Sequence, residues 1–339
     1  MPQPSPAPAG VDVDAVSAWF ADNVADSVAP LTFTQLAGGR SNLTYRVGDA
    51  EGNRWVLRRP PLTSTDPTAH SMAREWSILS LLASSPAPTP APVALCDDPA
   101  VTGALFYVMA HVPGIVLAAD ADADVFDAAH CRTISDSAVQ ALVDLHQVDC
   151  TTTQFDEFRR SGSYLERQLR RWSSQIEKIG TVTPDWSRAH RLLVERRPAE
   201  RYFGVVHGDF RLGNLLVDRS GAVTGILDWE LWSLGDVLAD LGWLVASWSS
   251  ADVFGWAPTP EAGFCTPAEV ISGYERATGF DAAQIDYYHA FALWRLACIA
   301  QGVLIRYTAG AMGDTDGVDM DLLTRRPAML AERALDLLS

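Results

Sequence analysis

Residues 207–217 read His207-Gly208-Asp209-Phe210-Arg211-Leu212-Gly213-Asn214-Leu215-Leu216-Val217, and residues 228–230 read Asp228-Trp229-Glu230. Two short apolar runs, 215–217 and 223–227, flank Asp218-Arg219-Ser220-Gly221, a sequence typical of a tight turn. The pattern predicts a β-hairpin. Its open end would bring Asn214 and Asp228 together, because facing residues of an antiparallel pair lie about 4.5–5.5 Å apart.

Asn214 and Asp228 carry the side-chain oxygens that a hard cation prefers. Mg²⁺ takes oxygen ligands at about 2.0–2.1 Å, so two such residues side by side can share one ion. Asp209 precedes Asn214 by five residues, on the loop that enters the hairpin. A carboxylate beside a metal site can orient a hydroxyl group and accept its proton. The residues therefore predict a metal site at Asn214 and Asp228 with a general base at Asp209.

The pattern H-G-D-x-x-x-x-N followed by D-W-E resembles the catalytic and metal loops of the aminoglycoside phosphotransferase and choline kinase family, a small-molecule branch of the protein-kinase fold. The resemblance extends from about residue 13 to the C-terminus. It implies Asp209 as catalytic base, Asn214 and Asp228 as holders of Mg²⁺ against the nucleotide phosphates, and His207 as a structural support of the loop. The implied fold is α+β and bilobal, protein-kinase-like, with a small antiparallel β-rich N-lobe and a larger, mostly α-helical C-lobe.

Hydrophobic spacing and turn residues predict the same two-part organisation. We expect a disordered Pro/Ala-rich tail over residues 1–12, an N-lobe over 13–112 and a C-lobe over 113–339, with the break at Pro113-Gly114. The segments expected in the N-lobe are a helix near 13–28, strands around 31–33, 43–47 and 55–57, a helix over 69–83 and a strand over 105–109. The helices expected in the C-lobe are 125–148, 160–179, 184–196, 236–249, 267–277, 283–308 and 326–338, with a small β segment near 203–228.

A glycine-rich segment, Gly38-Gly39-Arg40-Ser41-Asn42, lies between two of the predicted strands. Glycines at a hairpin tip let backbone N–H groups approach phosphates closely. In this position the segment resembles the nucleotide-covering loop of the family. The resemblance implies nucleotide contacts at Gly38, Gly39, Ser41 and Asn42.

Residues 106–114 resemble the strand and hinge between the two lobes. Backbone groups bind the adenine at such a hinge, and the resemblance implies the Ala110 carbonyl and the Val112 N–H for this contact. His111, between them, is interpreted as a surface residue of the hinge.

Glu75 shares its predicted helix face with the apolar residues Met72, Leu79 and Leu82, at positions −3, +4 and +7. A carboxylate on an inward face is costly unless it is paired. The alternative is a glutamate at the edge of the apolar stripe that reaches water. The family pairs this glutamate with a basic residue on the third strand that also grips the nucleotide phosphates. Arg58 occupies that position, and an arginine can bind a carboxylate or phosphate bidentately.

The family usually has lysine at the position of Arg58, whereas the only lysine of this chain is Lys178. The run Leu57-Arg58-Arg59-Pro60-Pro61 resembles a subgroup that includes the kinase-like N-terminal region of certain acyl-CoA dehydrogenase family members. Arg58 is therefore interpreted as a subgroup feature. It also motivates an alternative function, a catalytically silent nucleotide-binding module.

Charge and composition restrict the partners. The 339 residues contain 26 Lys plus Arg and 42 Asp plus Glu, for a net charge of −16. Such an anion repels phosphate backbones and anionic lipid, so we expect neither nucleic acid nor membrane as partner. We find no uninterrupted apolar run of about 18 residues and no secretory signal in residues 1–10.

The five cysteines are far apart and form no C-x-x-C pair, which favours buried free thiols and a cytoplasmic location.

Two further features of the C-lobe remain open to more than one interpretation. Asp240 resembles the buried aspartate that braces the family's catalytic loop, or it is an acid favoured by the N-terminal dipole of its helix. Trp294 and Arg295 lie in an otherwise apolar helix, where we expect them to pack rather than to line an acceptor pocket.

Nine residues separate Glu230 from Asp240, too few for the long activation segment of a protein kinase. We therefore expect a small-molecule acceptor, although a protein kinase remains a rival. The predicted activity is the Mg²⁺-dependent transfer of the γ-phosphate of ATP or GTP to a hydroxyl group of that acceptor. An aminoglycoside fits the family and the acidic charge, and a hydroxyacyl-CoA-type metabolite fits the subgroup.

Overall fold

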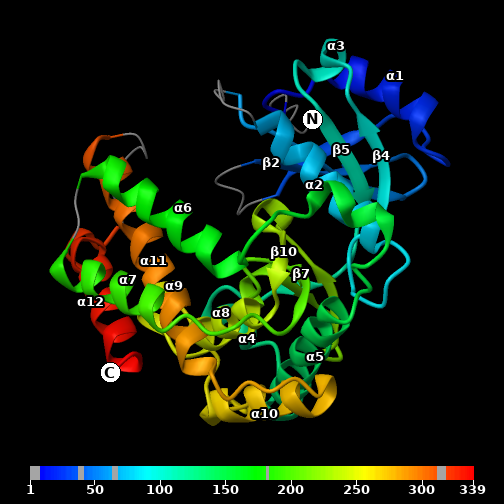
Figure 1. The fold of residues 1–339 in the computed structure, drawn as a ribbon. Coiled ribbons are helices and arrows are strands. Elements are labelled where there is room, and N and C mark those ends of the chain that lie inside the picture. The colour runs from blue at the N-terminus through cyan, green and yellow to red at the C-terminus, as the bar shows by residue number, and fades with distance from the viewer. Residues whose placement is uncertain (1–7, 37–41, 63–67, 181–182, 311–317) are drawn as a thin grey trace. The chain divides into compact units, whose positions relative to one another are not determined.

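The structure is a computed structural model that describes residues 8–36, 42–62, 68–180, 183–310 and 318–339. Figure 1 shows its helices and strands, which form two compact units. The N-terminal unit comprises residues 1–114 and 224–230, and the C-terminal unit comprises 115–223 and 231–339. The first division lies beside the expected break at Pro113-Gly114. Residues 224–230, which we had assigned to the C-lobe, belong to the N-terminal unit.

An antiparallel five-stranded sheet forms the N-terminal unit, with strand order β1-β2-β3-β5-β4. Its strands are β1 (Thr32–Gln35), β2 (Leu43–Gly48), β3 (Arg54–Arg59), β4 (Pro92–Cys96) and β5 (Phe106–Ala110). Its helices are α1 (Val13–Asn23), α2 (Thr68–Leu82) and α3 (Pro99–Thr102). Strand β4 was not predicted. It tolerates its initial Pro92 because it is an edge strand, where a missing N–H removes no central ladder bond.

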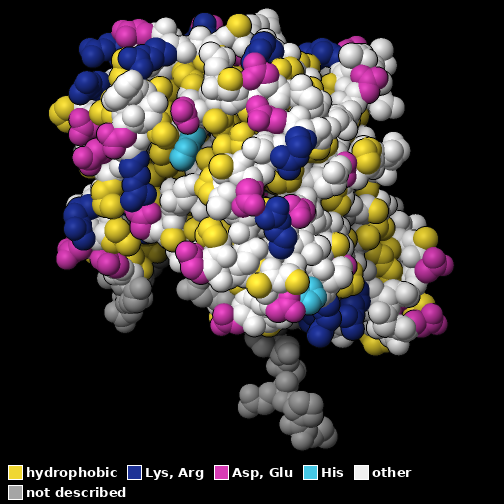
Figure 2. All heavy atoms as spheres, turned by 90° about the horizontal axis from the view of Figure 1, so that it is seen from below, with side chains coloured by type: hydrophobic (Ala, Val, Ile, Leu, Met, Phe, Trp, Pro, Cys, Tyr) yellow, Lys and Arg dark blue, Asp and Glu magenta, His cyan; other side chains and the backbone are white. Residues whose placement is uncertain are grey.

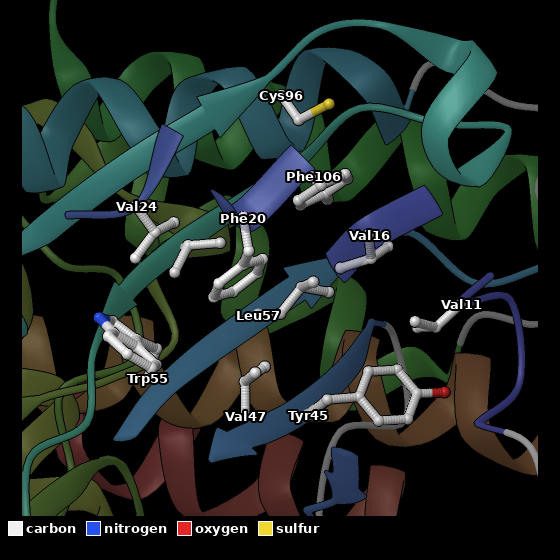
Figure 3. Close-up of a cluster of buried hydrophobic side chains, with 11 residues drawn as sticks. Val11, Val16, Phe20, Val24, Tyr45, Val47, Trp55, Leu57, Cys96 and Phe106 are labelled. Atoms are coloured by element: carbon white, nitrogen blue, oxygen red, sulfur yellow. The ribbon is translucent and has the colours of Figure 1, made fainter. Parts of the chain in front are cut away.

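Helix α1 covers one face of this sheet and closes a hydrophobic core (Figure 3). Val16 and Phe20 of α1 are fully buried. The sheet contributes buried side chains from four of its strands, namely Tyr45, Val47, Trp55, Leu57, Cys96, Phe106 and Val108. Because successive strand residues point to opposite faces, Arg58 and Tyr107 project away from this core, on the face that carries the candidate site.

Residues 8–12, which we had placed in the disordered tail, are ordered against the sheet. The Tyr45 hydroxyl donates a hydrogen bond to the Ala9 carbonyl at 2.6 Å, and Val11 is buried in the core. The Asp12 carboxylate caps α1 by accepting from the backbone N–H groups of Asp14 and Ala15. The predicted disorder is therefore wrong for residues 8–12, while residues 1–7 of that prediction lie outside the described residues.

Helices make up most of the C-terminal unit, as expected. The long ones are α5 (Ala128–His146), α6 (Tyr164–Ile179), α7 (Pro184–Glu195), α8 (Leu238–Trp248), α10 (Pro267–Thr278), α11 (Ile285–Thr308) and α12 (Met320–Leu337). Short helices are α4 (Asp120–Ala123) and α9 (Ala251–Phe254), and the strands are β6 (Ile115–Val116), β7 (Phe203–Val206), β8 (Leu215–Val217) and β10 (Ser233–Asp236). Strand β9 (Val223–Ile226) spans the boundary between the units. Helix α12 begins earlier than predicted, because Asp319 caps it and Pro327 is accommodated inside it.

Buried helices α8 and α11 pack against each other at the centre of the C-terminal unit. Gly242 allows this close contact, since a Cβ atom there would lie 2.5 Å from the Tyr288 carbonyl carbon. By length and composition alone, α11 would also qualify as a membrane span, which our search for uninterrupted apolar runs did not detect. However, 67% of its most apolar window is buried inside the structure, as in a core helix.

The five cysteines are buried and free, as expected. Figure 2 shows that basic and acidic side chains are interspersed over the face it displays, without a continuous basic stripe. The absence of a nucleic-acid partner stays an expectation from the net charge of −16.

Asp236, at the end of β10, provides a pH-dependent test of the C-terminal core. Burial raises the pKa of Asp236 to about 6, although the Tyr288 hydroxyl donates to the carboxylate at 2.6 Å. The unfolded pKa is about 3.9, so ionised Asp236 destabilises the fold, and this cost grows as the pH rises toward and past 6. We therefore compare the unfolding free energy of Asp236→Asn with that of the unmodified protein by urea denaturation. The difference in favour of the variant should increase by about 1 kcal/mol as the pH rises from 5 to 7.5.

Asp218→Asn is the matched control for this experiment. Hydrogen bonds from Ser220 lower the pKa of Asp218, so this half-buried carboxyl is ionised in both states throughout the interval. The difference between Asp218→Asn and the unmodified protein should therefore not change with pH. A pH-independent difference for Asp236→Asn would contradict the prediction.

Candidate active site

Arg58 of β3 and Glu75 of α2 form the ion pair that we predicted, with 2.8 Å between Nε and Oε2. Glu75 is only 1% exposed, so the alternative of a glutamate that reaches water is wrong. Among the described residues, the Tyr107 hydroxyl also donates to its carboxylate at 2.9 Å, and the Asn42 side-chain amide donates at 3.3 Å. Arg58 also bonds a second acid, because its Nη2 lies 2.6 Å from Asp228 Oδ1. One arginine thus connects two carboxylates.

The electrostatics of this cluster keep the arginine charged. Burial by itself disfavours the charge, but the carboxylates of Glu75 and Asp228 outweigh it and raise the pKa of Arg58. Burial raises the pKa of Glu75 as well, opposed by Arg58. The pKa of Tyr107 is raised far above its ordinary value by burial and by the neighbouring Glu75. Tyr107 therefore remains a neutral donor to the glutamate.

Asp228 has an unusual backbone conformation, with φ of 65°. Such values are uncommon outside glycine and often occur where a side chain must be aimed at a functional site. Its side chain is 36% exposed, whereas that of Arg58 is 12% exposed. The carboxylate therefore presents surface to solvent while one oxygen is held by Arg58.

The loop that follows β7 carries the H-G-D motif. Strand β7 pairs with β10, with Val206 facing Ser233, and the chain then turns at Gly208, where φ is +86°. A Cβ atom at Gly208 would lie 2.7 Å from the Leu231 carbonyl oxygen, so this position requires glycine. Asp209 follows on the loop, and its N–H donates to His207 Nδ1 at 3.1 Å. His207 therefore supports the loop, as the resemblance implied.

Asp240 braces the loop by accepting hydrogen bonds from its backbone. It is fully buried at the start of α8, and its two carboxylate oxygens accept from the backbone N–H groups of His207 at 2.5 Å and Gly208 at 2.8 Å. His146 lies 3.4 Å from the same carboxylate and 2.7 Å from the Tyr274 hydroxyl. Burial lowers the pKa of His146, so the histidine is neutral there. Of the two interpretations of Asp240, the loop brace is correct.

The Asp209 carboxylate is held on both oxygens. Oδ1 accepts from the Trp243 indole Nε1 at 2.7 Å and lies 3.4 Å from Arg211 Nε. Oδ2 accepts from Asn214 Nδ2 at 2.8 Å, and the same amide nitrogen donates to the Asp209 carbonyl at 2.8 Å. Both bonds of Asn214 use its nitrogen, so they leave its Oδ1, the atom that would bind a metal, uncommitted.

The structure leaves the predicted nucleotide contacts of the hinge and the glycine-rich segment untested. Ala110 ends β5, and its N–H donates to the Ala91 carbonyl at 2.8 Å, while Val112 follows at a half-buried position. Gly38, Gly39 and Ser41 lie outside the described residues. The nucleotide contacts assigned to these three residues and to Ala110 and Val112 stay predictions. Asn214 belongs to the C-terminal unit and Asp228 to the N-terminal unit, so their shared metal site also stays a prediction.

Four residues that contact the candidate site were given no role in it by the sequence analysis, namely Tyr107, Arg211, Trp243 and Arg295. Tyr107 and Trp243 lie in apolar segments, where an aromatic residue is indistinguishable from core. Arg295 was expected to pack, and it does lie against two indole rings, but its Nη2 also donates to the Gly208 carbonyl at 2.5 Å. A charged residue in the apolar 285–308 helix was the one available signal. Trp294 packs as expected, stacked on Trp186.

A small open hollow, with a cavity volume of about 20 Å³, adjoins the loop within the C-terminal unit. Its wall includes Arg211 and Gly213 from the loop, and its other residues are mostly apolar, among them Trp248, Phe254 and Trp256. The Arg211 guanidinium lies 5.7 Å from the Phe254 ring centroid. The hollow therefore combines aromatic walls with one cation beside Asp209.

An N-terminal five-stranded sheet with a buried Arg–Glu pair and a mostly helical unit with a braced H-G-D loop define the class of protein: the fold is protein-kinase-like. Residues 32–288 match the phosphotransferase enzyme family. The chain belongs to that family.

The chain is similar in sequence to part of several acyl-CoA dehydrogenase family members. It is 32% identical over 314 residues to acyl-CoA dehydrogenase family member 10 of Mus musculus and 29% identical over 322 residues to member 11 of Homo sapiens. These alignments cover 90% and 92% of the chain but only 29% and 41% of the relatives, so the chain spans less than half of their length. The run at Leu57–Pro61 thus pointed to the correct subgroup.

Solved structures share the fold. A putative aminoglycoside phosphotransferase from Ralstonia eutropha has a TM-score of 0.80 and 27% identity, covering 96% of this chain and 98% of that one. The aminoglycoside phosphotransferase APH(4)-Ia, solved with AMP-PNP and hygromycin B, has a TM-score of 0.59 and 16% identity, covering 94% and 98%. At that identity the second comparison speaks for the fold alone.

Proposed function

We propose that the chain is a Mg²⁺-dependent small-molecule phosphotransferase that moves the γ-phosphate of ATP or GTP to a hydroxyl group of its acceptor. The observation that carries the proposal is the Asp209 carboxylate on its braced loop, in a chain of the phosphotransferase enzyme family. Asp209 would accept the hydroxyl proton while the hydroxyl oxygen attacks phosphorus and the nucleoside diphosphate leaves.

The donor atoms present suit magnesium. Asn214 Oδ1 is left uncommitted by the two hydrogen bonds of its amide nitrogen, and Asp228 is partly exposed with only Oδ1 held by Arg58. Bound Mg²⁺ would neutralise charge on the nucleotide phosphates. A nucleotide donor is supported by the AMP-PNP-bound relative of the same fold. In this proposal Arg58 organises the site through Glu75 and Asp228 and contributes positive charge near the phosphates.

Two versions of the proposal differ in the class of molecule that accepts the phosphate. An aminoglycoside is supported by the Ralstonia structure, which is described as a putative aminoglycoside phosphotransferase. A hydroxyacyl-CoA-type metabolite is supported by the acyl-CoA dehydrogenase relatives. Arg211, 3.4 Å from the Asp209 carboxylate, and the aromatic side chains near it favour the second version, because they suit an acceptor with apolar and anionic parts better than a polycation.

A screen of acceptors tests the proposed function. Nucleoside diphosphate release would be measured with ATP and with GTP across aminoglycosides, choline-like amines, sugars, hydroxyacyl thioesters and a generic protein substrate. We expect Mg²⁺-dependent release with one small-molecule class and none with the protein. Nucleotide binding that ignores Mg²⁺, seen as equal thermal shifts with and without the metal, together with no turnover, would instead support the silent nucleotide-binding module.

Asp228→Ala is expected to remove the Mg²⁺ dependence of nucleotide binding. In the unmodified protein, calorimetry should show tighter ATP binding with Mg²⁺ than without it, by about tenfold or more, because Asp228 would help to hold the ion, which would neutralise phosphate charge. In the variant the two affinities should coincide. Asp97→Ala removes one exposed carboxylate from the same unit and serves as the charge-matched control. An unchanged Mg²⁺ dependence in Asp228→Ala would place the metal elsewhere.

The buried free thiols agree with a reducing compartment, and we propose a cytoplasmic location for the enzyme.

A further inference from the structure

Trp243 makes the shortest described contact to the Asp209 carboxylate. Its indole Nε1 donates to Oδ1 at 2.7 Å, and the side chain is 3% exposed within α8. An indole has only two side-chain torsions and donates through a single nitrogen, so a buried one fixes its acceptor in direction as well as distance. With Arg211 also on Oδ1, the carboxylate oxygen with fewer described contacts is Oδ2.

The guanidinium of Arg295, on α11, packs against the indole ring of Trp243. Its guanidinium lies 4.2 Å from the Trp243 ring centroid and 5.4 Å from that of Trp172, so two indoles enclose the cation. Its Nη2 donates to the Gly208 carbonyl at 2.5 Å, one residue before Asp209. The same side chain therefore contacts both the backbone of the loop and the ring that holds the carboxylate.

Burial of Arg295 is costly. The residue is 4% exposed, its Nε has no hydrogen-bond partner among the described residues, and no carboxylate of those residues lies within ion-pair distance. Burial lowers the pKa of Arg295, opposed by Tyr164, Asp209 and Asp240. An apolar residue would fill this place between two rings at lower cost if packing were its only role.

We infer that Trp243 and Arg295 act together as positioning residues for Asp209. Trp243 holds Oδ1, so that Oδ2 is turned to receive the acceptor proton, and Arg295 fixes both the indole and the Gly208 carbonyl. The inference rests on the proposed role of Asp209 as general base. It adds that the orientation of this base is set by two residues that lie 34 and 86 positions further along the chain.

Kinetics of three variants test the pair. Trp243→Phe keeps a ring for Arg295 to cover but removes the donor. We expect kcat to fall about ten- to a hundredfold with both KM values within about threefold, because misorientation of a base affects the transition state rather than ground-state binding. Arg295→Met should lower kcat similarly, and Arg295→Lys should recover part of the loss, since lysine retains a cation and a donor.

Trp186→Phe is the matched control. Trp186 is also buried in the C-terminal unit, with 7% exposure against 3% for Trp243, and its Nε1 donates to Cys298 Sγ rather than to a residue of the loop. It should lose stability comparable to Trp243→Phe, by thermal denaturation, while keeping kcat. Equal kcat values for Trp243→Phe and Trp186→Phe, or an unchanged kcat in folded Trp243→Phe, would overturn the inference.

A second measurement needs no turnover and so separates this inference from the proposed function. In protein with ¹⁵N-labelled indoles, the Trp243 Nε1–H signal is the one missing from Trp243→Phe. Asp209→Asn should move that signal more than any other indole signal, because Asp209 is its acceptor. A Trp243 signal that does not respond would refute the contact even if the enzyme is active. A responsive signal in a protein that transfers no phosphate would refute the proposed function and leave the contact intact.

Discussion

Asp209→Ala is expected to abolish measurable phosphoryl transfer while leaving nucleotide affinity within a few-fold of the unmodified value. General-base catalysis contributes about 10²–10⁴-fold, and removal of the carboxylate also removes the acceptor of Trp243 and Asn214. Nucleotide binding should persist, because the loop brace at Asp240 and the Arg58 cluster do not involve the Asp209 side chain. Product formation and nucleotide titration on the same preparation measure the two effects.

The control for this experiment is Asp286→Ala, which removes an exposed carboxylate from the same unit at the start of α11. It should turn over normally. Retained turnover in Asp209→Ala would exclude Asp209 as the base. A joint loss of turnover and nucleotide affinity would instead indicate that the side chain maintains the loop rather than acting on the acceptor.

Arg58→Met is expected to lower the unfolding free energy by about 3–5 kcal/mol as well as the activity. The methionine fills a similar volume but leaves Glu75, 1% exposed, without its cation. Removing one partner of a buried ion pair leaves an uncompensated charge, which costs more than the pair contributes. Urea denaturation at pH 7.5 measures the loss. If Arg58→Met is as stable as the unmodified protein, the pair does not bear on the fold.

The double variant Arg58→Met/Glu75→Gln separates pairing from packing. With the charge of Glu75 also removed, part of the stability should return, because the glutamine can still bond Tyr107. Activity should not return, since Asp228 has still lost the guanidinium that holds its Oδ1. Arg58→Lys restores the residue usual in the family. It should keep most of the stability but cannot reach Glu75 and Asp228 with two separate nitrogens, as the guanidinium does.

Local patterns were sufficient for much of the architecture. The 3.6-residue period of apolar side chains predicted the long helices, and the turn residues between alternating runs predicted the N-terminal strands β1, β2 and β3. The Arg58–Glu75 pair was predicted as well: a carboxylate on an apolar helix face needs a partner, and the resemblance to the family implied that this partner is the basic residue on the third strand. The failures were elements without a periodic signal, such as the edge strand β4 and the four-residue β10.

By itself the sequence determined the two-part α+β organisation, the loop with its H-G-D motif and the acid–base residue types at the site, since each depends on residues near one another in the chain. Only the tertiary structure decided that Asp240 accepts hydrogen bonds from the loop and that Tyr107 donates to Glu75. It also decided that Trp243 donates to Asp209 and that Arg295 donates to the neighbouring Gly208 carbonyl. Those contacts depend on which face of α8 and α11 meets the loop. Helical periodicity shows that a face is buried but not what it is buried against, so a long-range partner is set by packing alone.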